Sequence, residues 1–231
     1  MLKIENTEVV GWEAAIRGMR NPMNSWEMSD SGTIPICNEL KEIFIGKYFT
    51  VGDNDHDLMT RLRNAGTDHR KFMRMITVYL DITAPLYWWK EFDTYKVGTV
   101  ANSCSTMHKI AAKEFTLDDF SHEHLQGPGL VNLEQTIKLL NYYRECFNET
   151  IISERRDGLD GEKVKKDWWW QMIQLLPSSY NQRRTVILNY EVLANIYKSR
   201  RNHKLTEWHT FCDWIESLPY SGLITGGDKK K

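Results

Sequence analysis

The chain has 231 residues, of which 41% are hydrophobic and 26% charged, close to an ordinary globular composition. Its 30 lysines and arginines against 31 aspartates and glutamates do not make the basic field of a dedicated nucleic-acid-binding protein. The sequence has no run of ~18 apolar residues, and its first residues lack the basic-then-apolar order of a signal peptide. We therefore expect a cytoplasmic protein without a membrane span or a nucleic-acid partner.

Cysteine and histidine positions do not indicate a metal centre. The four cysteines lie far apart, form no CxxC pair and predict neither a zinc module nor a disulfide framework: Cys37, Cys104, Cys146 and Cys212. The segment His122–His124, with Asp118 and Asp119 nearby, has metal-ligating side chains, but they point the same way only if the segment is extended. An exposed loop is expected there instead, so we predict no metal site.

The most regular alternation in the sequence predicts a half-buried strand over Met75–Thr83. The residues on its apolar face are Ile76, Val78, Leu80 and Ile82. Thr83-Ala84-Pro85 is then expected to stop the strand and open a helix, with Pro85 near its first turn. That helix should run to about Lys96 and end at Gly98. A weaker helical pattern follows over Ser105–Phe115.

Two further helices and two loops are expected beyond this point. His122–Gly129 reads as a loop, after which Asn132 is expected to cap a helix. The apolar stripe of that helix is Leu133, Ile137, Leu140, Tyr143, Phe147 and Ile151. Ser153–Lys166 predicts a charged loop, and Trp168–Leu176 predicts a helix stopped by Pro177.

Tryptophans are clustered at Trp88-Trp89 and at Trp168-Trp169-Trp170. Such clusters indicate a thick core or a subunit interface. Three consecutive residues of a helix span ~200° of its circumference. The three cannot all face one core, so at least one of them should point away from its own domain.

The helix predicted over Tyr190–Arg201 combines apolar and polar residues on one stripe: Asn189, Leu193, Ile196, Arg200 and His203. An arginine on the inward side of a helix is costly unless an anion or a carboxylate meets it. Arg200 is therefore either part of a structural salt bridge or an anion-binding residue in a cleft. His69, Arg70 and Arg74 also crowd positive charge before the strand, for an anionic ligand or for a solvated surface.

The sequence contains no GxGxxG, GxxxxGK[ST], GxSxG or HExxH motif, so Rossmann, P-loop, serine-hydrolase and zincin functions have no support. Cys104, between Ser103 and Ser105, has no recognisable partner base, which disfavours a nucleophilic role. With no internal repeat or linker, one α/β domain over residues 1–225 is the simplest organisation. The polar tail, residues 226–231, is expected to be disordered.

Two stretches of the chain together carry a family likeness. In the first, Leu62–His69 gives a helix end and a glycine–histidine loop, the strand follows, and Ala84–Phe92 opens the next helix. In the second, the shared positions are Leu176, Pro177, Asn189, Leu193, Asn195, Arg200, His203 and Trp208. In order and separation these stretches resemble the flavin-dependent thymidylate synthases. The resemblance covers about a third of the chain closely and most of it loosely.

The departures from that family fall on its phosphate-binding motif. Thr94-Tyr95-Lys96 stands where the family has Arg-His-Arg, and Thr99 stands at its first serine. The family's later serine and arginine fall near Cys104, Ser105 and Thr106, with Lys109 the nearest cation. Its arginine before Leu-Pro falls around Ile173-Gln174. These changes remove charge, because neither lysine nor threonine replaces a bidentate arginine. Other cations would then hold the nucleotide, namely Lys96, Lys109, Arg183 and Arg184, or the ligand differs.

The resemblance implies a mixed α/β (α+β) fold of one domain, with an antiparallel sheet flanked by helices, assembled as a homotetramer. It also implies reductive methylation of dUMP to dTMP with FAD, NADPH and methylenetetrahydrofolate. Arg200 would be catalytic and bind the pyrimidine. The cofactor-binding residues would be His69, Tyr95, Lys96, Asn189, Asn195 and His203. The substrate-binding residues would be Thr99, Cys104, Ser105, Lys109 and Arg200. Two alternatives are a flavoenzyme for another pyrimidine nucleotide and a non-catalytic relative that binds a nucleotide or only assembles.

Overall fold

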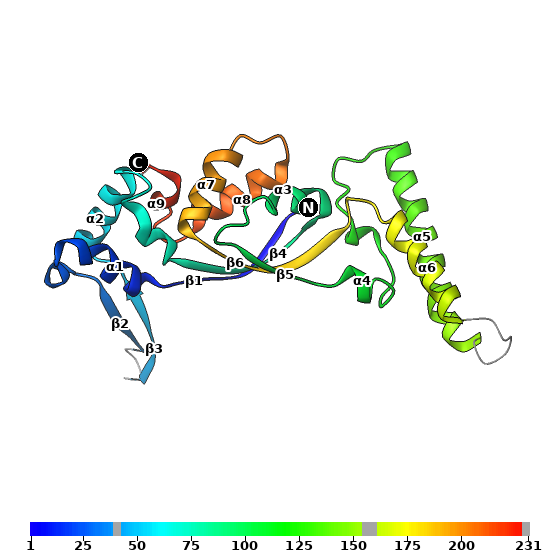
Figure 1. The fold of residues 1–231 in the computed structure, drawn as a ribbon, viewed down its shortest axis with the longest axis horizontal. Coiled ribbons are helices and arrows are strands. Elements are labelled where there is room, and N and C mark those ends of the chain that lie inside the picture. Colours follow the sequence, from blue (N-terminus) through cyan, green and yellow to red (C-terminus); the bar gives the residue numbers. More distant parts are fainter. Residues whose placement is uncertain (39–42, 154–160, 228–231) are drawn as a thin grey trace. The chain divides into compact units, whose positions relative to one another are not determined.

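The computed structural model describes residues 1–38, 43–153 and 161–227. Its main sheet has four strands in the order β1 (Lys3–Val10), β4 (Thr77–Pro85), β6 (Asn181–Asn189) and β5 (Val100–Ser103). A second sheet pairs β2 (Gly32–Asn38) antiparallel with β3 (Ile43–Thr50), so that Thr33 lies opposite Phe49. The predicted fold class, an antiparallel sheet flanked by helices, is confirmed (Figure 1).

The chain divides into two compact units that both include parts of β4, β5 and β6. The hairpin unit comprises Met1–Lys3, Ile82–Thr94 and Asn102–Thr185. The α7 unit comprises Ile4–Asp81, Tyr95–Ala101 and Val186–Lys231. The predicted domain limits, 1–225 and a tail, stay a prediction. Residues 228–231 of that tail lie outside the described residues, and Gly226 caps the last helix.

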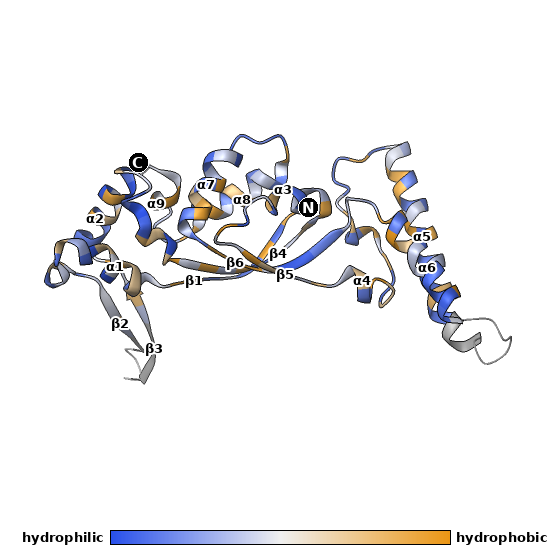
Figure 2. Cartoon of the chain, viewed as in Figure 1, coloured by the Kyte–Doolittle hydropathy of each residue, from blue (hydrophilic) through white to orange (hydrophobic). Residues whose placement is uncertain are grey.

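The hairpin unit is built on two long helices that run side by side, α5 (Pro128–Ser153) and α6 (Gly161–Leu175) (Figure 1). The unit also contains α3 (Leu86–Phe92), α4 (Thr106–Lys109) and the short 3-10 helix η4 (Leu117–Asp119). Hydrophobic and hydrophilic residues interchange along both long helices (Figure 2). The residues buried in their shared core are Ile110, Ala111, Phe115, Phe120, Leu133, Ile137, Leu140 and Met172.

The predicted stripe of α5 is confirmed, but its predicted start is wrong. Leu133, Ile137 and Leu140 are buried, and Tyr143 and Phe147 pack against the same core. The side chain of Ile151 lies outside the described residues. The helix begins at Pro128 rather than at Asn132 because proline suits a first helical turn, where a backbone N–H has no helical partner.

Residues 161–166 of the predicted charged loop belong to α6, and 154–160 lie outside the described residues. The ammonium of Lys165 lies 4.7 Å from the centre of the Phe147 ring. This cation–π contact with α5 stabilises the N-terminal part of α6. The predicted helix end before Pro177 is confirmed, since α6 stops at Leu175. Trp170 is 42% exposed, so one of the three tryptophans does point away from the core.

The predicted strand is confirmed by β4, whose Val78, Leu80 and Ile82 are fully buried. Its limits lie about two residues later than expected, because Thr83-Ala84-Pro85 continues the strand instead of opening the helix. A residue before proline is forced toward extended backbone, which suits a strand. The expected apolar residue Ile76 precedes the strand and is also buried.

The two helices predicted after β4 are shorter than expected. The first, α3, ends at Phe92 and not at Lys96, where the Thr94 hydroxyl donates to the carbonyl of Glu91 (2.7 Å) and competes with further helix. The second, α4, covers only Thr106–Lys109. Phe115 is held instead by the Asn141 side chain, which bonds both its N–H (2.8 Å) and its carbonyl (2.9 Å).

The α7 unit gathers its helices around an apolar core. The elements are α1 (Trp12–Arg20), α2 (Asp53–Asn64), α7 (Tyr190–Arg200), α8 (Thr206–Ser217) and α9 (Gly222–Thr225), with 3-10 turns η1 (Asn21–Met23), η2 (Trp26–Met28) and η3 (Arg70–Arg74). The core includes Met59, Phe72, Leu193, Ile196, Trp208 and Phe211, each at most 3% exposed. A buried ion pair, Arg20 with Asp55 at 2.6 Å, joins α1 to α2.

Candidate functional site

Helix α7 has the face and the start that the sequence predicted, and it ends one residue earlier, at Arg200. Its N-cap is Asn189, whose side-chain oxygen accepts a hydrogen bond from the N–H of Val192 (3.0 Å). Leu193 and Ile196 are fully buried and fix the orientation of the helix. Arg200 and His203 are partly buried at its C-terminal end, where positive charge is favourable to the helix dipole.

Arg200 lies in a cluster of aromatic rings, named here the Arg200 cluster: Tyr95, Arg200, His203 and Trp208. The Nε of Arg200 donates to the hydroxyl of Tyr95 (2.9 Å), and its guanidinium lies 4.8 Å from the centre of the Trp208 ring. The rings of Tyr95 and His203 both contact Trp208 edge-on, at centroid distances of 6.2 and 6.3 Å. Such packing holds a cation in one orientation while leaving its charge in place.

The loop before β5 passes close to the start of α7. Gly98 has a left-handed φ of 77°, and a Cβ added there would lie 3.0 Å from Nδ2 of Asn189. The hydroxyl oxygen of the next residue, Thr99, is buried without a hydrogen-bond partner in the part of the chain that the structure describes. A buried hydroxyl of this kind suits a ligand partner. Lys96, in the same loop, is exposed.

The basic group before β4 meets a carboxylate of α7. Glu191 accepts from Nε of Arg70 (3.3 Å) and also pairs with Arg74. Burial raises the pKa of Glu191, but the hydrogen bonds and charges of the two arginines outweigh it and lower that pKa. Asn195 accepts from Nη2 of Arg70 (3.4 Å), whereas His69, beside Arg70, is exposed. This network is first of all structural, since it ties η3 to α7.

The structure thus places eight of the predicted residues in the α7 unit and three in the hairpin unit. The three are Cys104, Ser105 and Lys109. Cys104 is an exposed free thiol, the Ser105 side chain caps α4 by accepting from the N–H of His108 (3.1 Å), and Lys109 is exposed. Capping gives Ser105 a structural task, and the substrate roles of all three stay predictions.

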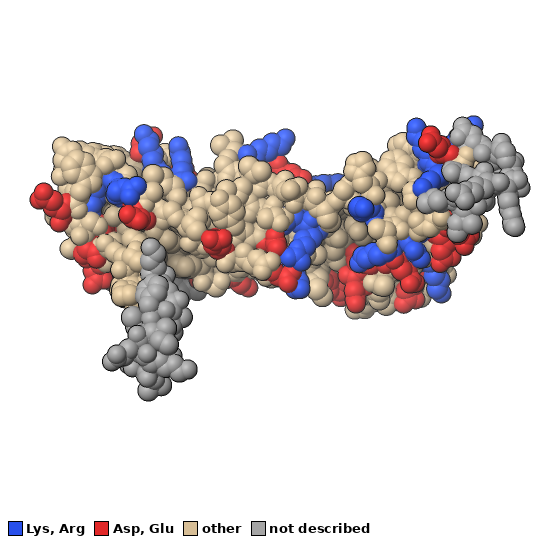
Figure 3. All heavy atoms as spheres, turned by 90° about the horizontal axis from the view of Figure 1, so that it is seen from below, with Lys and Arg blue, Asp and Glu red and all other residues tan. Residues whose placement is uncertain are grey.

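Arg184, which the sequence offered as a replacement cation for the nucleotide, already contacts other side chains of the hairpin unit. It donates to Asp93 (2.7 Å) and to the side chain of Gln182 (2.9 Å), and it stacks 4.1 Å from the centre of the Trp89 ring. Arg183 is exposed. On the face shown in Figure 3, acidic and basic side chains are interspersed, as the near-neutral charge suggests.

Sequence reasoning singled out Arg70 but missed the other cations that the α7 unit groups with it. A cavity of about 350 Å³, named here the α7 cavity, is lined by Arg63, Arg70, Asn195, Lys198 and Arg201 among others. Asn195, Lys198 and Arg201 follow one another at three-residue spacing, so helical periodicity could have placed them on a common face. Arg63 comes from α2 and gives no such signal in the sequence.

Within residues 1–38, 43–153 and 161–227, no group of three His, Cys, Asp or Glu side chains could hold a metal ion. His122 instead contacts the carbonyl of Phe120 (2.8 Å), and Asp119 closes a capping box with Thr116. No described helix is long and apolar enough to cross a membrane.

Comparison with known proteins gives a match at the level of structure. No family model and no curated protein sequence matches the chain. A crystal structure of thymidylate synthase X (ThyX) from Helicobacter pylori with FAD and dUMP superimposes with a TM-score of 0.59 at 15% identity, covering 98% of each chain. The chain has a ThyX-like fold. A second ThyX structure from the same organism, also with FAD and dUMP, has a TM-score of 0.58 at 15% identity and covers 97% of this chain and 98% of that one.

Proposed function

We propose that the chain is a flavin-dependent thymidylate synthase-like enzyme that converts dUMP to dTMP. The observation that carries this proposal is the fold match along 98% of both chains to a ThyX that holds FAD and dUMP. Four residues that gave the sequence resemblance lie on one helix, α7, or directly before or after it: Asn189, Asn195, Arg200 and His203. Fold and residue pattern therefore support the same function independently.

The side chains of the α7 unit fit a flavin nucleotide. The buried hydroxyl of Thr99, which lacks a partner among the described residues, offers a hydrogen bond to a ligand. Asn189 uses its oxygen as the helix cap, so its amide nitrogen is the group that would donate to a flavin carbonyl. Asn195 on the same helix and His203 just after it add polar groups. Tyr95, His69 and Lys96 are the further candidates for cofactor contact.

When bound, FAD would carry the hydride that NADPH supplies, and methylenetetrahydrofolate would supply the carbon. The chain itself has to orient the pyrimidine and stabilise its developing negative charge. Arg200 is suited to this task, because Tyr95 and Trp208 fix the orientation of its guanidinium. Thr99, Cys104, Ser105 and Lys109 are proposed to contact the nucleotide substrate. A cytoplasmic homotetramer is part of the proposal.

The second candidate is a flavoenzyme that acts on another pyrimidine nucleotide. Thr94-Tyr95-Lys96 carries one charge where the family motif carries two arginines, and the Tyr95 hydroxyl is engaged by Arg200. A nucleotide that needs fewer phosphate contacts at this position would fit that change.

The test begins with the spectrum of the purified protein supplied with FAD. Flavin absorbance should survive gel filtration with the protein peak. A colourless protein with no FAD affinity at tens of micromolar, roughly −6 kcal/mol, would contradict both enzyme functions. Rescue of a thymidine-requiring host then separates the two, since only the thymidylate synthase restores growth.

A further inference from the structure

The α7 cavity has an unusual charge. Its wall contains four cations, Arg63, Arg70, Lys198 and Arg201, together with the amide of Asn195 and the hydroxyl of Thr225. None of the described residues that line it is acidic. Four like charges around one cavity repel one another unless carboxylates or a bound anion compensate them.

Carboxylates outside the wall compensate two of these cations. Arg70 shares Glu191 with Arg74, and Arg201 pairs with Asp213 (2.9 Å) and Glu216 (3.3 Å). These carboxylates therefore hold both arginines in place and offset their charge.

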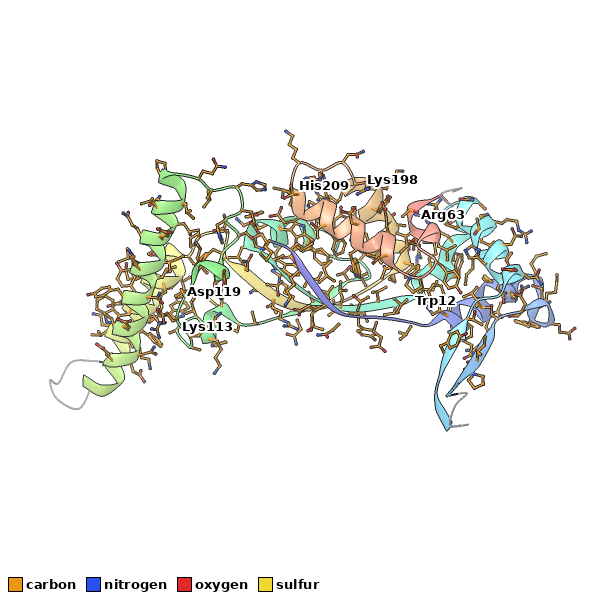
Figure 4. All side chains as sticks on the ribbon, turned by 180° about the vertical axis from the view of Figure 1, so that it is seen from behind. Trp12, Arg63, Lys113, Asp119, Lys198 and His209 are labelled. Carbon is orange, nitrogen blue, oxygen red and sulfur yellow. The ribbon has the colours of Figure 1, made fainter. Side chains whose placement is uncertain are left out.

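Arg63 and Lys198 carry the surplus charge. Arg63 donates to the carbonyls of Leu223 (3.1 Å) and Ile224 (3.4 Å), contacts that orient it without neutralising it. Burial and the charge of Arg70 both lower the pKa of Arg63, as expected for a cation short of negative charge. Lys198 is exposed, and within the described chain neither it nor Arg63 pairs with a carboxylate. Both are labelled in Figure 4, Arg63 on α2 and Lys198 on α7.

The position of Gly226 strengthens this geometry. A Cβ there would lie 2.3 Å from Nη2 of Arg63, and the residue has a left-handed φ of 89°. Only glycine lets the end of α9 approach the guanidinium so closely. The end of α9 thus fixes Arg63 at the cavity without offsetting its charge.

We infer that the α7 cavity binds the diphosphate group of the flavin dinucleotide, an inference that rests on the proposed function. A diphosphate bridge carries about two negative charges, which matches the two uncompensated cations, and arginine and lysine are the residues that bind phosphate oxygens. The site would lie within one chain, and it would supply the positive charge that Thr94-Tyr95-Lys96 lacks.

Binding of inorganic pyrophosphate to the flavin-free protein, followed by isothermal titration calorimetry at low salt, tests the cavity directly. Lys198→Ala should weaken binding about tenfold, the loss of one charge-assisted contact. Lys204→Ala removes an equal charge from an exposed lysine beyond the end of α7 and should change it less than about twofold. Absence of pyrophosphate binding at about 1 mM, or equal effects of the two variants, would overturn the inference.

The same variants, titrated with FAD and riboflavin, identify the source of the diphosphate. Lys198→Ala should weaken FAD about tenfold and leave riboflavin, which has no phosphate, unchanged. If the variant weakens pyrophosphate and ADP but not FAD, the cavity serves another nucleotide and the flavin assignment is wrong. Because the pyrophosphate measurement uses no flavin, a protein that binds pyrophosphate but no flavin contradicts the proposed function separately.

Discussion

Removal of Arg20 should destabilise the chain strongly, because it breaks a fully buried ion pair. Arg20 is 3% exposed and Asp55 is not exposed, and they meet at 2.6 Å. Breaking such a pair typically costs ~3–5 kcal/mol. Asp55 keeps hydrogen bonds from the hydroxyls of Ser29 and Ser31 (both 2.6 Å) and from the Ser31 N–H (3.2 Å), which places Arg20→Ala near the lower value, about 3 kcal/mol.

Urea unfolding followed by the fluorescence of the nine tryptophans measures this loss. With a denaturant slope of roughly 2–3 kcal/mol per molar, the midpoint should fall by about 1 M. The matched control is Arg17→Ala on the same helix, whose pair with Glu13 is 3.3 Å long and mostly exposed. That control should cost no more than ~0.5 kcal/mol. Equal losses for the two variants would refute the reasoning.

The effect of Arg20 should also depend on pH in a defined direction. Burial raises the pKa of Asp55, but hydrogen bonds from Ser29, Ser31 and Arg20, with the charge of Arg20, outweigh it and lower that pKa. A carboxyl with a lowered folded pKa stabilises the protein above its unfolded pKa of about 4, and this stability is lost as the pH falls through the folded value. The gap between wild type and Arg20→Ala should therefore shrink below about pH 4. A gap unchanged from pH 7 to pH 3 would contradict the pairing.

Three further outcomes are expected. Tyr95→Phe removes the acceptor of the Arg200 hydrogen bond but keeps the ring, so urea unfolding should show a loss of about 1 kcal/mol; no loss would mean that the bond is absent. In thiol labelling read out by peptide mass, exposed Cys104 should react in the folded protein, whereas buried Cys212, whose pKa burial raises to about 11, should react only on unfolding; equal rates would contradict this. Light scattering should give a mass that is a multiple of the 27.2 kDa chain. Trp170→Ala, which removes an exposed tryptophan from the expected interface, should lower that mass, and a wild-type monomer would exclude the tetramer.

Helix α7 and strand β4 could be predicted from the sequence because the information is local. In α7, a side-chain cap at Asn189 and buried residues at helical spacing, Leu193 and Ile196, agree with one another. In β4, the alternation of buried and partly exposed residues matches the strand period. Arg200 and Trp208 were both among the shared positions of the resemblance, and the structure brings them into contact.

The failures arise where distant contacts decide the local structure. Thr83-Ala84-Pro85 remains in the strand because β4 lies between β1 and β6. These neighbouring strands supply hydrogen-bond partners to a backbone that could otherwise turn. The Phe115 segment leaves the helical pattern because Asn141 satisfies its backbone from another element. The α7 cavity likewise needs Arg63 and Lys198 to meet from helices more than a hundred residues apart in sequence.

Tyr95 stands in the altered motif and reaches helix α7 through its hydrogen bond with Arg200. Its position corresponds to the histidine of the family's Arg-His-Arg motif, yet here its hydroxyl and ring hold Arg200 against Trp208. That segment therefore orients one cation on α7 and carries no charge at Thr94. Positive charge reappears on α2 and α7, where Arg63 and Lys198 face a cavity with no described acid in its wall. Since a phosphate ligand requires compensating charge wherever it binds, under the proposed function the cavity would supply the charge that the motif lacks.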